Sequence, residues 1–241
     1  MRPKISVIIV ALNEAKLLPR CLRALQNQSY PQENYEVILV DNGSTDQTVA
    51  IAKEFGVHVY SYTQIQGCGA ARKYGALQAK GSILAFTDAD CMVSFNWLSQ
   101  IDEALQDSKL SFVAGKAVPD KKTTAMNIVF TIYDTFYSLH HRLGKPLVWG
   151  FNMAVKKDAY DTIKGVNSSL LSSDDWDLAF RLQRRFGKKS LRYMRDLQVT
   201  TSTRKQDNPK ILFRYTADSV RNYIDYVIFG RTKAVPVFHV R

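Results

Sequence analysis

Short apolar runs alternate with amphipathic stretches through roughly the first 90 residues of the chain. Strand-type runs cover residues 5–11, 35–40, 57–60 and 83–88. Between them, helical spacing or helix-opening residues mark residues 17–25, 46–55 and 67–79. Strands that alternate with helices form parallel sheets, because parallel neighbours need a long connection that a crossover helix supplies. The chain is therefore predicted to be an α/β protein with helices packed over a mainly parallel sheet.

Polar residues stand where three of these runs end. Asn13 follows the first run, Asp41 ends the second, and Asp88 and Asp90 end the fourth. The carboxyl ends of parallel strands meet at one edge of the sheet, and ligands of such folds bind in the crevice beyond that edge. We therefore expect these four side chains to line one binding site.

The carboxylates of Asp88 and Asp90 are separated by a single residue. Two ionised carboxylates at this spacing repel each other unless a cation lies between them. A divalent metal that carries phosphate oxygens is the natural partner for such hard oxygen ligands. A solvated turn at the end of a strand is the structural alternative, and the pair alone does not decide between the two.

The pattern is less regular after Asp90. Helices are predicted over residues 95–106, 126–143, from 157, 172–186 and 211–229, and strands over 110–115, 149–155 and 190–200. Ser172 and Ser173 are good helix caps, and the acids after them suit the start of a helix. No repeat, low-complexity tract or long linker interrupts the sequence. We therefore expect one domain with a C-terminal extension.

The net charge of +11 is concentrated toward the C-terminal end. Residues 188–241 contain twelve Lys or Arg and four Asp or Glu, a balance of +8, which leaves +3 for residues 1–187. A basic segment suits an anionic partner such as a membrane face, a phosphorylated substrate or nucleic acid. A basic face that only keeps the protein soluble fits the same charge, so composition leaves these alternatives open.

Cysteine usage and hydropathy bear on location. Cys21, Cys68 and Cys91 are odd in number and lack metal-ligand spacing, which is typical of reduced thiols in a cytosolic protein. No signal peptide is evident, and no run approaches the roughly 20 apolar residues of a membrane-spanning helix. We therefore expect a cytoplasmic protein whose basic end makes peripheral contact with the cytoplasmic face of a membrane.

Six motifs follow one another along the chain. They are Ser6–Glu14, Val40–Asp46, Gly67–Gly75 with Ala71-Arg72, Asp88-Ala89-Asp90, Asn152-Met153-Ala154 and Asp174-Asp175. In this order and spacing they resemble the inverting GT-A-fold glycosyltransferases of family 2. The resemblance implies a single Rossmann-like, three-layer α/β/α domain at residues 1–205, with a nucleotide-sugar half at 1–92 and an acceptor half at 93–205. Residues 206–241 would then form a basic, amphipathic C-terminal extension.

The resemblance assigns the first half to the donor, a nucleotide-diphosphate sugar that is expected to be UDP-linked. Ala11, Asn13 and Glu14 match the segment that lies along the nucleotide. Asp41 matches the acid that hydrogen-bonds the base, although it could instead only shape the turn that follows it. Arg72 matches a basic residue near the nucleotide and diphosphate, and its structural alternative is a surface arginine on a helix.

Asp88-Ala89-Asp90 resembles the metal motif of the same family. Asp90 is expected to ligate Mg²⁺ or Mn²⁺, and Asp88 to hold the ribose or the shell of the metal, with Ala89 between them in the donor site. Such a metal bridges the two phosphates and neutralises charge on the leaving diphosphate.

Asp175 aligns with the catalytic base of the family, so we expect it to be the general base for the acceptor hydroxyl. Asp174 replaces the more usual Glu, which leaves its role open, and both residues could instead be helix-capping acids. One base and one displacement imply inversion at the anomeric carbon. The Gln-X-X-Arg-Trp motif of processive synthases is absent, which favours transfer of a single sugar.

Further residues are candidates for the acceptor side. Trp149, Phe151 and Trp176 could stack on sugar faces, although buried aromatic residues usually belong to a core. Asn152 belongs to one of the matching motifs, and Arg204 is expected near the diphosphate. The expected acceptor is a glycan or a lipid-linked molecule in cell-envelope, polysaccharide or lipid-linked glycan synthesis, with a polyprenyl phosphate as the alternative.

Other functions fit parts of the sequence. Gly67-Cys68-Gly69, with Asp88 about 20 residues on, resembles a dinucleotide-binding fingerprint, but Arg72 stands where a third glycine would be. A non-catalytic nucleotide- or glycan-binding module on the same fold is a second alternative. A nucleic-acid binder is a third, but it rests on charge alone, and we expect no nucleic-acid partner. The C-terminal segment could meet a membrane, pack on the domain or form a homodimer.

Overall fold

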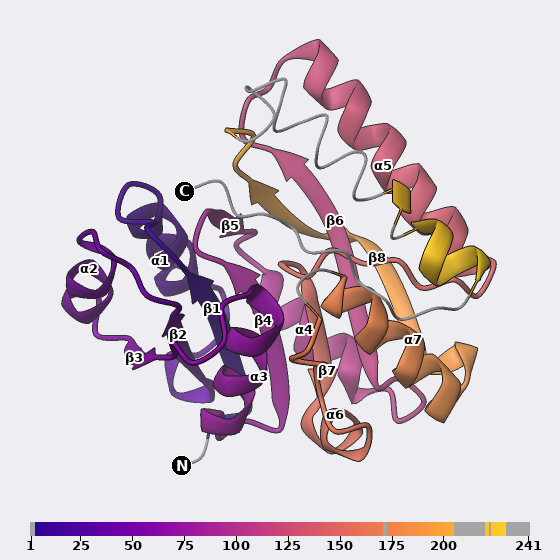
Figure 1. The fold of residues 1–241 in the computed structure, drawn as a ribbon, viewed down its shortest axis with the longest axis horizontal. Coiled ribbons are helices and arrows are strands. Elements are labelled where there is room, and N and C mark those ends of the chain that lie inside the picture. Colours follow the sequence, from indigo (N-terminus) through magenta and orange to yellow (C-terminus); the bar gives the residue numbers. More distant parts are fainter. Residues whose placement is uncertain (1–2, 171–172, 205–219, 222, 230–241) are drawn as a thin grey trace.

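One eight-stranded sheet organises the described part of the chain. The computed structural model describes residues 3–170, 173–204, 220–221 and 223–229. The strand order is β3-β2-β1-β4-β7-β6-β8-β5, with helices on both sides of the sheet (Figure 1). The strands are β1 (Ile5–Ala11), β2 (Tyr35–Asp41), β3 (His58–Ser61), β4 (Ile83–Asp88), β5 (Cys91–Val93), β6 (Phe112–Pro119), β7 (Met153–Lys156) and β8 (Leu191–Thr201).

The sheet is mainly parallel, as the alternation of elements predicts. β3, β2, β1 and β4 are parallel neighbours, and β6 and β8 form a second parallel pair. β7 is inserted antiparallel between β4 and β6, and β5 lies antiparallel to β8 at the far edge. The expected boundary between the nucleotide-sugar half and the acceptor half, after residue 92, falls within β5, so one sheet extends across both halves.

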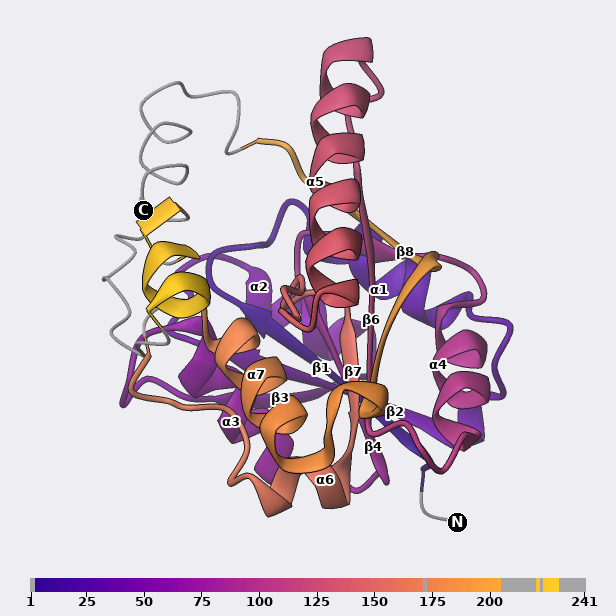
Figure 2. The ribbon, with the colours of Figure 1, turned by 90° about the vertical axis from the view of Figure 1, so that its right-hand side faces the viewer.

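Helices cover both faces and create two hydrophobic cores. The helices are α1 (Leu18–Gln26), η1 (Gln32–Asn34), α2 (Thr48–Glu54), α3 (Cys68–Gln78), α4 (Trp97–Gln106), α5 (Thr124–Arg142), α6 (Lys157–Thr162), α7 (Asp174–Phe186), η2 (Lys188–Ser190) and η3 (Ile224–Ile228). α1, α2 and α4 contribute to one core, and α3, α5, α6 and α7 to the other. This is the predicted three-layer α/β/α arrangement (Figure 2).

β1 has a continuous apolar sequence because helices cover both faces of the sheet. Val7 and Ile9 point into one core, whereas Ile8 and Val10 point into the other. Successive side chains of a strand lie on opposite faces, so a strand that is buried on both faces has no polar alternation.

Two local predictions differ from the structure, and one strand, β5, has no predicted counterpart. The expected strand over residues 149–155 begins only at Met153, because Trp149–Asn152 forms a turn in which the N–H of Asn152 donates to the carbonyl of Trp149 at 2.9 Å. β5 is too short to give a sequence signal. Ser173 has a left-handed backbone with φ 57° and makes no capping hydrogen bond, so its predicted role as a cap of α7 is wrong, and Ser172 lies outside the described residues.

The predicted helix at residues 211–229 is described only in part. Residues 211–219 lie outside the described residues, while 224–228 form one π-helical turn. Tyr226 is buried with its ring 6.4 Å from that of Phe180, and Lys145 donates to the carbonyl of Val227 at 3.0 Å. This turn therefore packs on the domain. In the ranges that the structure describes, no helix combines the length and the apolar character needed to cross a membrane.

Candidate active site

Strand register places three predicted residues at one edge of the sheet. Ala11 lies opposite Asp41 in the β1–β2 pair, and Val10 lies opposite Asp88 in the β1–β4 pair. The two aspartates thus end the strands on either side of β1. The crevice expected from the sequence lies beyond this edge.

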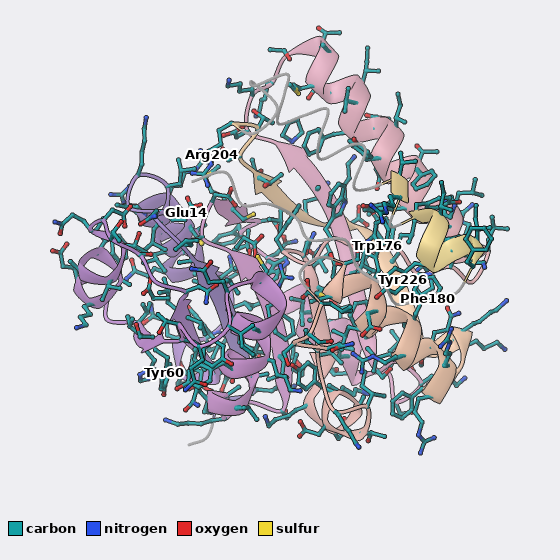
Figure 3. All side chains as sticks on the ribbon, in the orientation of Figure 1. Glu14, Tyr60, Trp176, Phe180, Arg204 and Tyr226 are labelled. Carbon is teal, nitrogen blue, oxygen red and sulfur yellow. The ribbon has the colours of Figure 1, made fainter. Side chains whose placement is uncertain are left out.

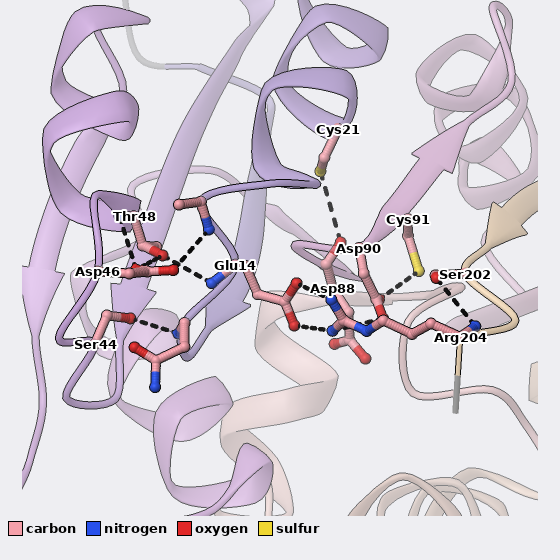
Figure 4. Close-up of polar contacts among 12 residues, drawn as sticks. Glu14, Cys21, Ser44, Asp46, Thr48, Asp88, Asp90, Cys91, Ser202 and Arg204 are labelled. Carbon is pink, nitrogen blue, oxygen red and sulfur yellow. Dashed lines mark hydrogen bonds and ion pairs between the residues drawn. The ribbon is translucent and has the colours of Figure 1, made fainter. Parts of the chain in front are cut away.

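The loop after β1 is fastened to the loop after β2. Asn13 has a left-handed backbone with φ 55°, a conformation that Asn tolerates better than most residues. Its Oδ1 accepts from the N–H of Thr45 at 2.8 Å. Its own N–H donates to Oγ of Ser44 at 2.8 Å, a contact drawn at Ser44 in Figure 4. Asn13 therefore bridges two loops with its side chain and its backbone.

The same pair of loops is joined a second time, one residue further on. The N–H of Glu14 donates to Oγ1 of Thr48 at 2.8 Å, and the N–H of Ala15 donates to Oδ2 of Asp46 at 3.1 Å. Burial acts to raise the pKa of Asp46, but hydrogen bonds from Thr48 and Ala15 outweigh it and lower that pKa. Asp46 consequently stays ionised and keeps the two loops together.

The side chain of Asp41 bonds to the backbone of the turn that follows it. Its side chain is only 3% exposed, and its carboxylate accepts the N–H groups of Gly43 at 3.3 Å and Ser44 at 3.1 Å. The turn-shaping role considered for Asp41 is therefore present in the structure. A contact from Asp41 to a base stays a prediction.

Arg72 joins the two halves of the chain from within the protein. It is 5% exposed, so the alternative of a surface arginine is wrong. Its Nη2 lies 3.2 Å from Oδ1 of Asp88, and its Nη1 lies 2.9 Å from Oδ2 of Asp174. A Cβ on Gly150 would stand 2.8 Å from this guanidinium, so only glycine lets the backbone approach so closely. Burial acts to lower the pKa of Arg72, but Asp174 and Asp88 outweigh it, and Arg72 stays charged.

Arg204 reaches the opposite carboxylate of the Asp88-Ala89-Asp90 motif. Its Nη2 lies 3.4 Å from Oδ2 of Asp90, and its Nη1 donates to Oε2 of Glu14 at 2.8 Å. Figure 3 shows Glu14 and Arg204 facing each other near the upper rim of the sheet, and Figure 4 shows the contacts in detail. Arg204, expected near the diphosphate, is thus beside the motif that would hold it.

A divalent metal fits this pair of carboxylates when phosphate oxygens complete its coordination. Among the described residues, no group of three or more His, Cys, Asp or Glu side chains could hold a metal ion by itself. Mg²⁺ is commonly held by one or two carboxylates together with substrate phosphates, and it keeps several waters. Asp88 and Asp90 supply oxygen ligands of that kind, so the donor set agrees with the chemistry without a third protein ligand.

Asp174 and Asp175 differ in environment although they are adjacent at the start of α7. Asp174 is 4% exposed and is neutralised by Arg72. Asp175 is half-buried, and one of its oxygens accepts the N–H of Trp176 at 2.9 Å. Burial raises the pKa of Asp175 to about 7, Asp174 adds to the rise, and Arg72 acts against it. A carboxyl with such a pKa can accept a proton near neutral pH.

Comparison with known proteins agrees with this arrangement. A model of the family described as glycosyl transferase family 2 matches residues 6–163. The chain belongs to glycosyltransferase family 2. It is 32% identical to the glycosyltransferase AglE of Haloferax volcanii over 185 residues, which are 72% of this chain and 59% of AglE. The chain thus spans less than two thirds of that relative. The alternative of a dinucleotide-dependent oxidoreductase is wrong.

A second relative covers nearly the whole chain. It is the dolichyl N-acetyl-alpha-D-glucosaminyl phosphate 3-beta-D-2,3-diacetamido-2,3-dideoxy-beta-D-glucuronosyltransferase of Methanococcus voltae, 26% identical over 97% of this chain and 74% of that one. Among solved structures, the mannosyltransferase PcManGT of Pyrobaculum calidifontis superposes with a TM-score of 0.78 at 20% identity, over 98% of this chain and 66% of that one. The GT-A fold expected for this family 2 chain is confirmed.

Two residues expected on the acceptor side lie in the protein interior instead. Asn152 is fully buried, and its amide donates to the carbonyls of Lys116 and Leu197 at 2.9 Å and accepts from Nε1 of Trp97 at 2.9 Å. Trp176 is 8% exposed and donates to the carbonyl of Val148 at 3.0 Å. Both side chains are thus bonded within the core, and a contact of either with an acceptor stays a prediction.

Trp149 and Phe151 are half-buried and lie in an aromatic cluster next to the site. Their rings stack with centroids 5.4 Å apart. The ring of Trp149 also lies 5.7 Å from that of Tyr133 and 4.6 Å from that of Tyr137, both on α5. Asp175 accepts a hydrogen bond from the N–H of Gly150, the residue between the two stacked rings. This cluster therefore connects the start of α7 with α5.

Two residues that support the site were missed in the sequence. Arg20 donates to the carbonyl of Asp90 at 3.3 Å and pairs with Asp120 at 3.2 Å. Asp120 also accepts from the N–H and the hydroxyl of Thr203, at 2.9 and 2.8 Å, which holds the loop that carries Arg204. Both residues stand outside the matching motifs, and their partners are 70 to 100 positions away, so no local signal marks them.

Proposed function

We propose that the protein is an inverting glycosyltransferase that moves a single sugar from a nucleotide-diphosphate sugar, UDP-linked, to an acceptor hydroxyl. In the proposed step, the acceptor oxygen bonds to the anomeric carbon while the bond from that carbon to the diphosphate breaks. The electron pair of that bond leaves with the diphosphate, and the acceptor proton passes to Asp175. The sugar passes through an oxocarbenium-like state, as in glycoside hydrolysis.

The observation that carries the proposal is a charge chain formed by Asp88, Arg72 and Asp174. Arg72 contacts both Asp88 and Asp174, so the end of a donor-side strand and the start of α7 belong to one electrostatic unit. Asp175, the neighbour of Asp174, has a pKa of about 7 because of burial and that like charge. A site that keeps one carboxylate paired and leaves the next one as a weak base suits proton removal from a hydroxyl.

On the donor side, we assign the nucleotide to the loops that contain Asn13 and Asp41, and the diphosphate to Asp88, Asp90 and Arg72. A bound Mg²⁺ or Mn²⁺ would lie at Asp88 and Asp90 and would supply charge neutralisation for the leaving diphosphate. The neighbour PcManGT is described in complex with GDP-Man and Mn²⁺, and S. aureus TarS with UDP-GlcNAc, which supports a metal and a nucleotide-sugar here.

The proposed acceptor is a hydroxyl on a lipid-linked molecule at the cytoplasmic face of a membrane. The names of two relatives support it. The Methanococcus voltae enzyme is named for a dolichyl phosphate sugar, and the beta-monoglucosyldiacylglycerol synthase of Nostoc sp. is named for a glucosylated lipid product. A polyprenyl phosphate is the second candidate. A phosphate has a second pKa of roughly 6 and is largely ionised at neutral pH, so it needs no general base. The raised pKa of Asp175 favours the hydroxyl.

A donor screen tests this function. Purified protein is incubated with UDP- and GDP-sugars, with Mg²⁺ or Mn²⁺ or with a chelator, and released nucleotide is measured with and without lipid-linked acceptors. We expect metal-dependent release from one UDP-sugar that rises when a hydroxyl acceptor is added. If donor binds but no donor is ever turned over with any acceptor, the non-catalytic binding module is the correct alternative.

A further inference from the structure

Helix α5 has two faces of opposite character. Its inner face carries Phe130 and Tyr137, which are 5% and 7% exposed, and Asp134, which is 6% exposed. Asp134 accepts from the hydroxyl of Tyr193 at 2.9 Å and pairs with Arg195 at 3.3 Å. Figure 2 shows the N-terminal turns of α5 standing clear of the sheet and of the other helices.

The outer face of α5 is apolar and open to solvent. Ile128, Ile132, Leu139 and Leu143 are 55%, 61%, 51% and 61% exposed. Val129, Tyr133 and Phe136 add further exposed apolar surface, at 41%, 38% and 38%. Their spacing of three, four or seven residues places them on one side of a helix. A monomeric protein rarely leaves a continuous apolar stripe of this kind uncovered unless it binds something.

Within residues 121–143, the exposed charges are all of one sign. Asp134 is the single acid of α5, and it is on the inner face. Lys121 and Lys122 are exposed just before the helix, and Arg142 is exposed at its end. The apolar stripe of α5 has cations at both ends and, between residues 121 and 143, no exposed acid. This pattern is complementary to an anionic lipid surface, where apolar side chains enter the acyl boundary and cations meet the headgroups.

The described C-terminal turn continues the stripe. The hydroxyl of Tyr223 lies 2.7 Å from Nε2 of His140, and its ring lies 5.6 Å from that of Phe136. On the same turn, Ile224 and Ile228 are 39% and 62% exposed. Figure 1 shows this turn beside the C-terminal end of α5. Exposed apolar surface therefore extends from α5 onto residues 223–229.

We propose that the outer face of α5, together with Ile224 and Ile228, docks the protein on an anionic lipid bilayer. A second copy of the chain fits this face less well. In a symmetric pair, parallel or antiparallel contact of two α5 helices brings Lys121 and Lys122 beside a like-charged end of the partner helix. Lipid phosphates remove that repulsion.

The position of the face also suits the proposed transfer, and this step rests on the proposed function. Tyr133 of the exposed face contacts Trp149, and Gly150 donates to the candidate base Asp175. A lipid-linked acceptor held at α5 would thus have its head group toward the start of α7.

Vesicle flotation tests the docking surface without any donor or acceptor. Protein comprising residues 1–241 is mixed with vesicles of phosphatidylcholine alone or with added phosphatidylglycerol. We expect flotation with the anionic vesicles only. Ile132→Glu and, separately, Leu139→Glu should reduce the bound fraction by about tenfold or more, because each places a carboxylate on the buried side of the interface. The double variant Lys121→Gln/Lys122→Gln should reduce anionic-vesicle binding by a similar factor.

The matched control is Leu77→Glu, since Leu77 is 72% exposed and its helix, α3, lies apart from α5 on the same side of the sheet (Figure 1). It should float like the original protein. Equal losses in Leu77→Glu and Ile132→Glu would overturn the proposal, as would the absence of flotation with both vesicles. Sedimentation distinguishes self-association from membrane docking. If the protein is a dimer that Ile132→Glu dissociates, and if it never floats with vesicles, the outer face of α5 is a dimer interface and the proposal is wrong. If the protein transfers sugar but does not float, only the docking surface is wrong. If it floats but does not transfer sugar, only the proposed function is wrong.

Discussion

The proposed donor side and the proposed acceptor side of the site are held by different interactions. On the donor side, hydrogen bonds such as those of Asn13 with Ser44 and Thr45 fasten two adjacent loops. On the acceptor side, the buried Arg72 pairs with Asp174, and the neighbouring Asp175 has a pKa raised to about 7. Hydrogen bonds between loops fix a shape at little cost. Buried charges fix a chemical state, and removing one partner is expensive.

The largest expected effect comes from Asp175→Asn, which leaves the shape of the acceptor side and removes its base. General-base catalysis typically contributes about 10²–10⁴-fold to the rate. We expect kcat to fall within that range while donor binding, measured by calorimetry with UDP, is unchanged. Asp161→Asn, at the exposed end of α6, is the control and should keep full activity. A fall in donor affinity equal to the fall in kcat would place Asp175 on the donor side instead.

The pH dependence of the same pair sharpens this prediction. Asp175 must be ionised to act as a base, so kcat/KM should rise with pH and level off above about 7, and Asp175→Asn should lack this limb. Stability has the opposite sign. The folded protein holds the Asp175 proton more tightly than the unfolded chain, so the carboxylate destabilises the fold increasingly from pH 3.8 to about 7. Asp175→Asn should therefore melt at a higher temperature than the original protein at pH 8 and equally at pH 3.5.

The next effect is that of Arg72→Met, which removes the charge shared by the two sides. Asp88 and Asp174 would then lose their buried partner, and breaking a buried ion pair in this way costs about 3–5 kcal/mol. Denaturant unfolding at pH 7 measures the loss. Lys73→Met, one residue further along α3 and half-buried, is the matched control. Lowering the pH should restore part of the stability of Arg72→Met, since protonated carboxyls need no cation. An unchanged unfolding free energy would contradict the charge chain.

Asn152→Leu tests whether the acceptor half is organised by buried polar groups as well as by charge. The change leaves Nε1 of Trp97 and the carbonyls of Lys116 and Leu197 without their partner. Each buried polar group that loses its hydrogen bond costs about 1–3 kcal/mol, so we expect a loss on the order of 3 kcal/mol. Asn96→Leu is the control, because the exposed Asn96 makes no capping hydrogen bond. A stable Asn152→Leu protein with a raised acceptor KM would return Asn152 to the acceptor site.

The sequence predicts the donor half much better than the acceptor half, and the same comparison explains why. Ala11, Asp41 and Asp88 end strands that follow from local apolar runs, and parallel pairing brings strand ends together without further information. The contacts of Arg72 with Asp174 and of Arg204 with Glu14 join residues 102 and 190 positions apart. No periodicity carries such pairings.

The buried hydrogen bonds of Asn152 and Trp176 are a second feature that the sequence does not reveal. Asn152 and Trp176 belong to a matching motif or adjoin one, and both are polar or amphipathic residues that often bind sugars. In the structure, the turn at residues 149–152 and the irregular register between β6 and β8 at Gly115 leave carbonyls that the Asn152 amide satisfies. The sequence of residues 149–155 alone does not reveal that a β-bulge between β6 and β8 leaves carbonyls that need a hydrogen-bond donor.

Arg204→Gln gives the smallest expected change in stability and tests whether charge on the donor side acts on ligands rather than on the fold. Arg204 is 39% exposed at its side chain, and exposed ion pairs contribute about 0–1 kcal/mol. Unfolding should therefore shift by less than about 1 kcal/mol, with the same result for Arg192→Gln, whose exposed pair with Asp107 lies away from the site. The donor KM should separate the two variants. Arg204→Gln should raise it severalfold in low salt, since a guanidinium beside Asp90 is placed to meet a diphosphate, whereas Arg192→Gln should leave it unchanged. If both variants have the same donor KM, Arg204 does not act on the donor, and its contact with Glu14 only holds the loop that carries Arg204.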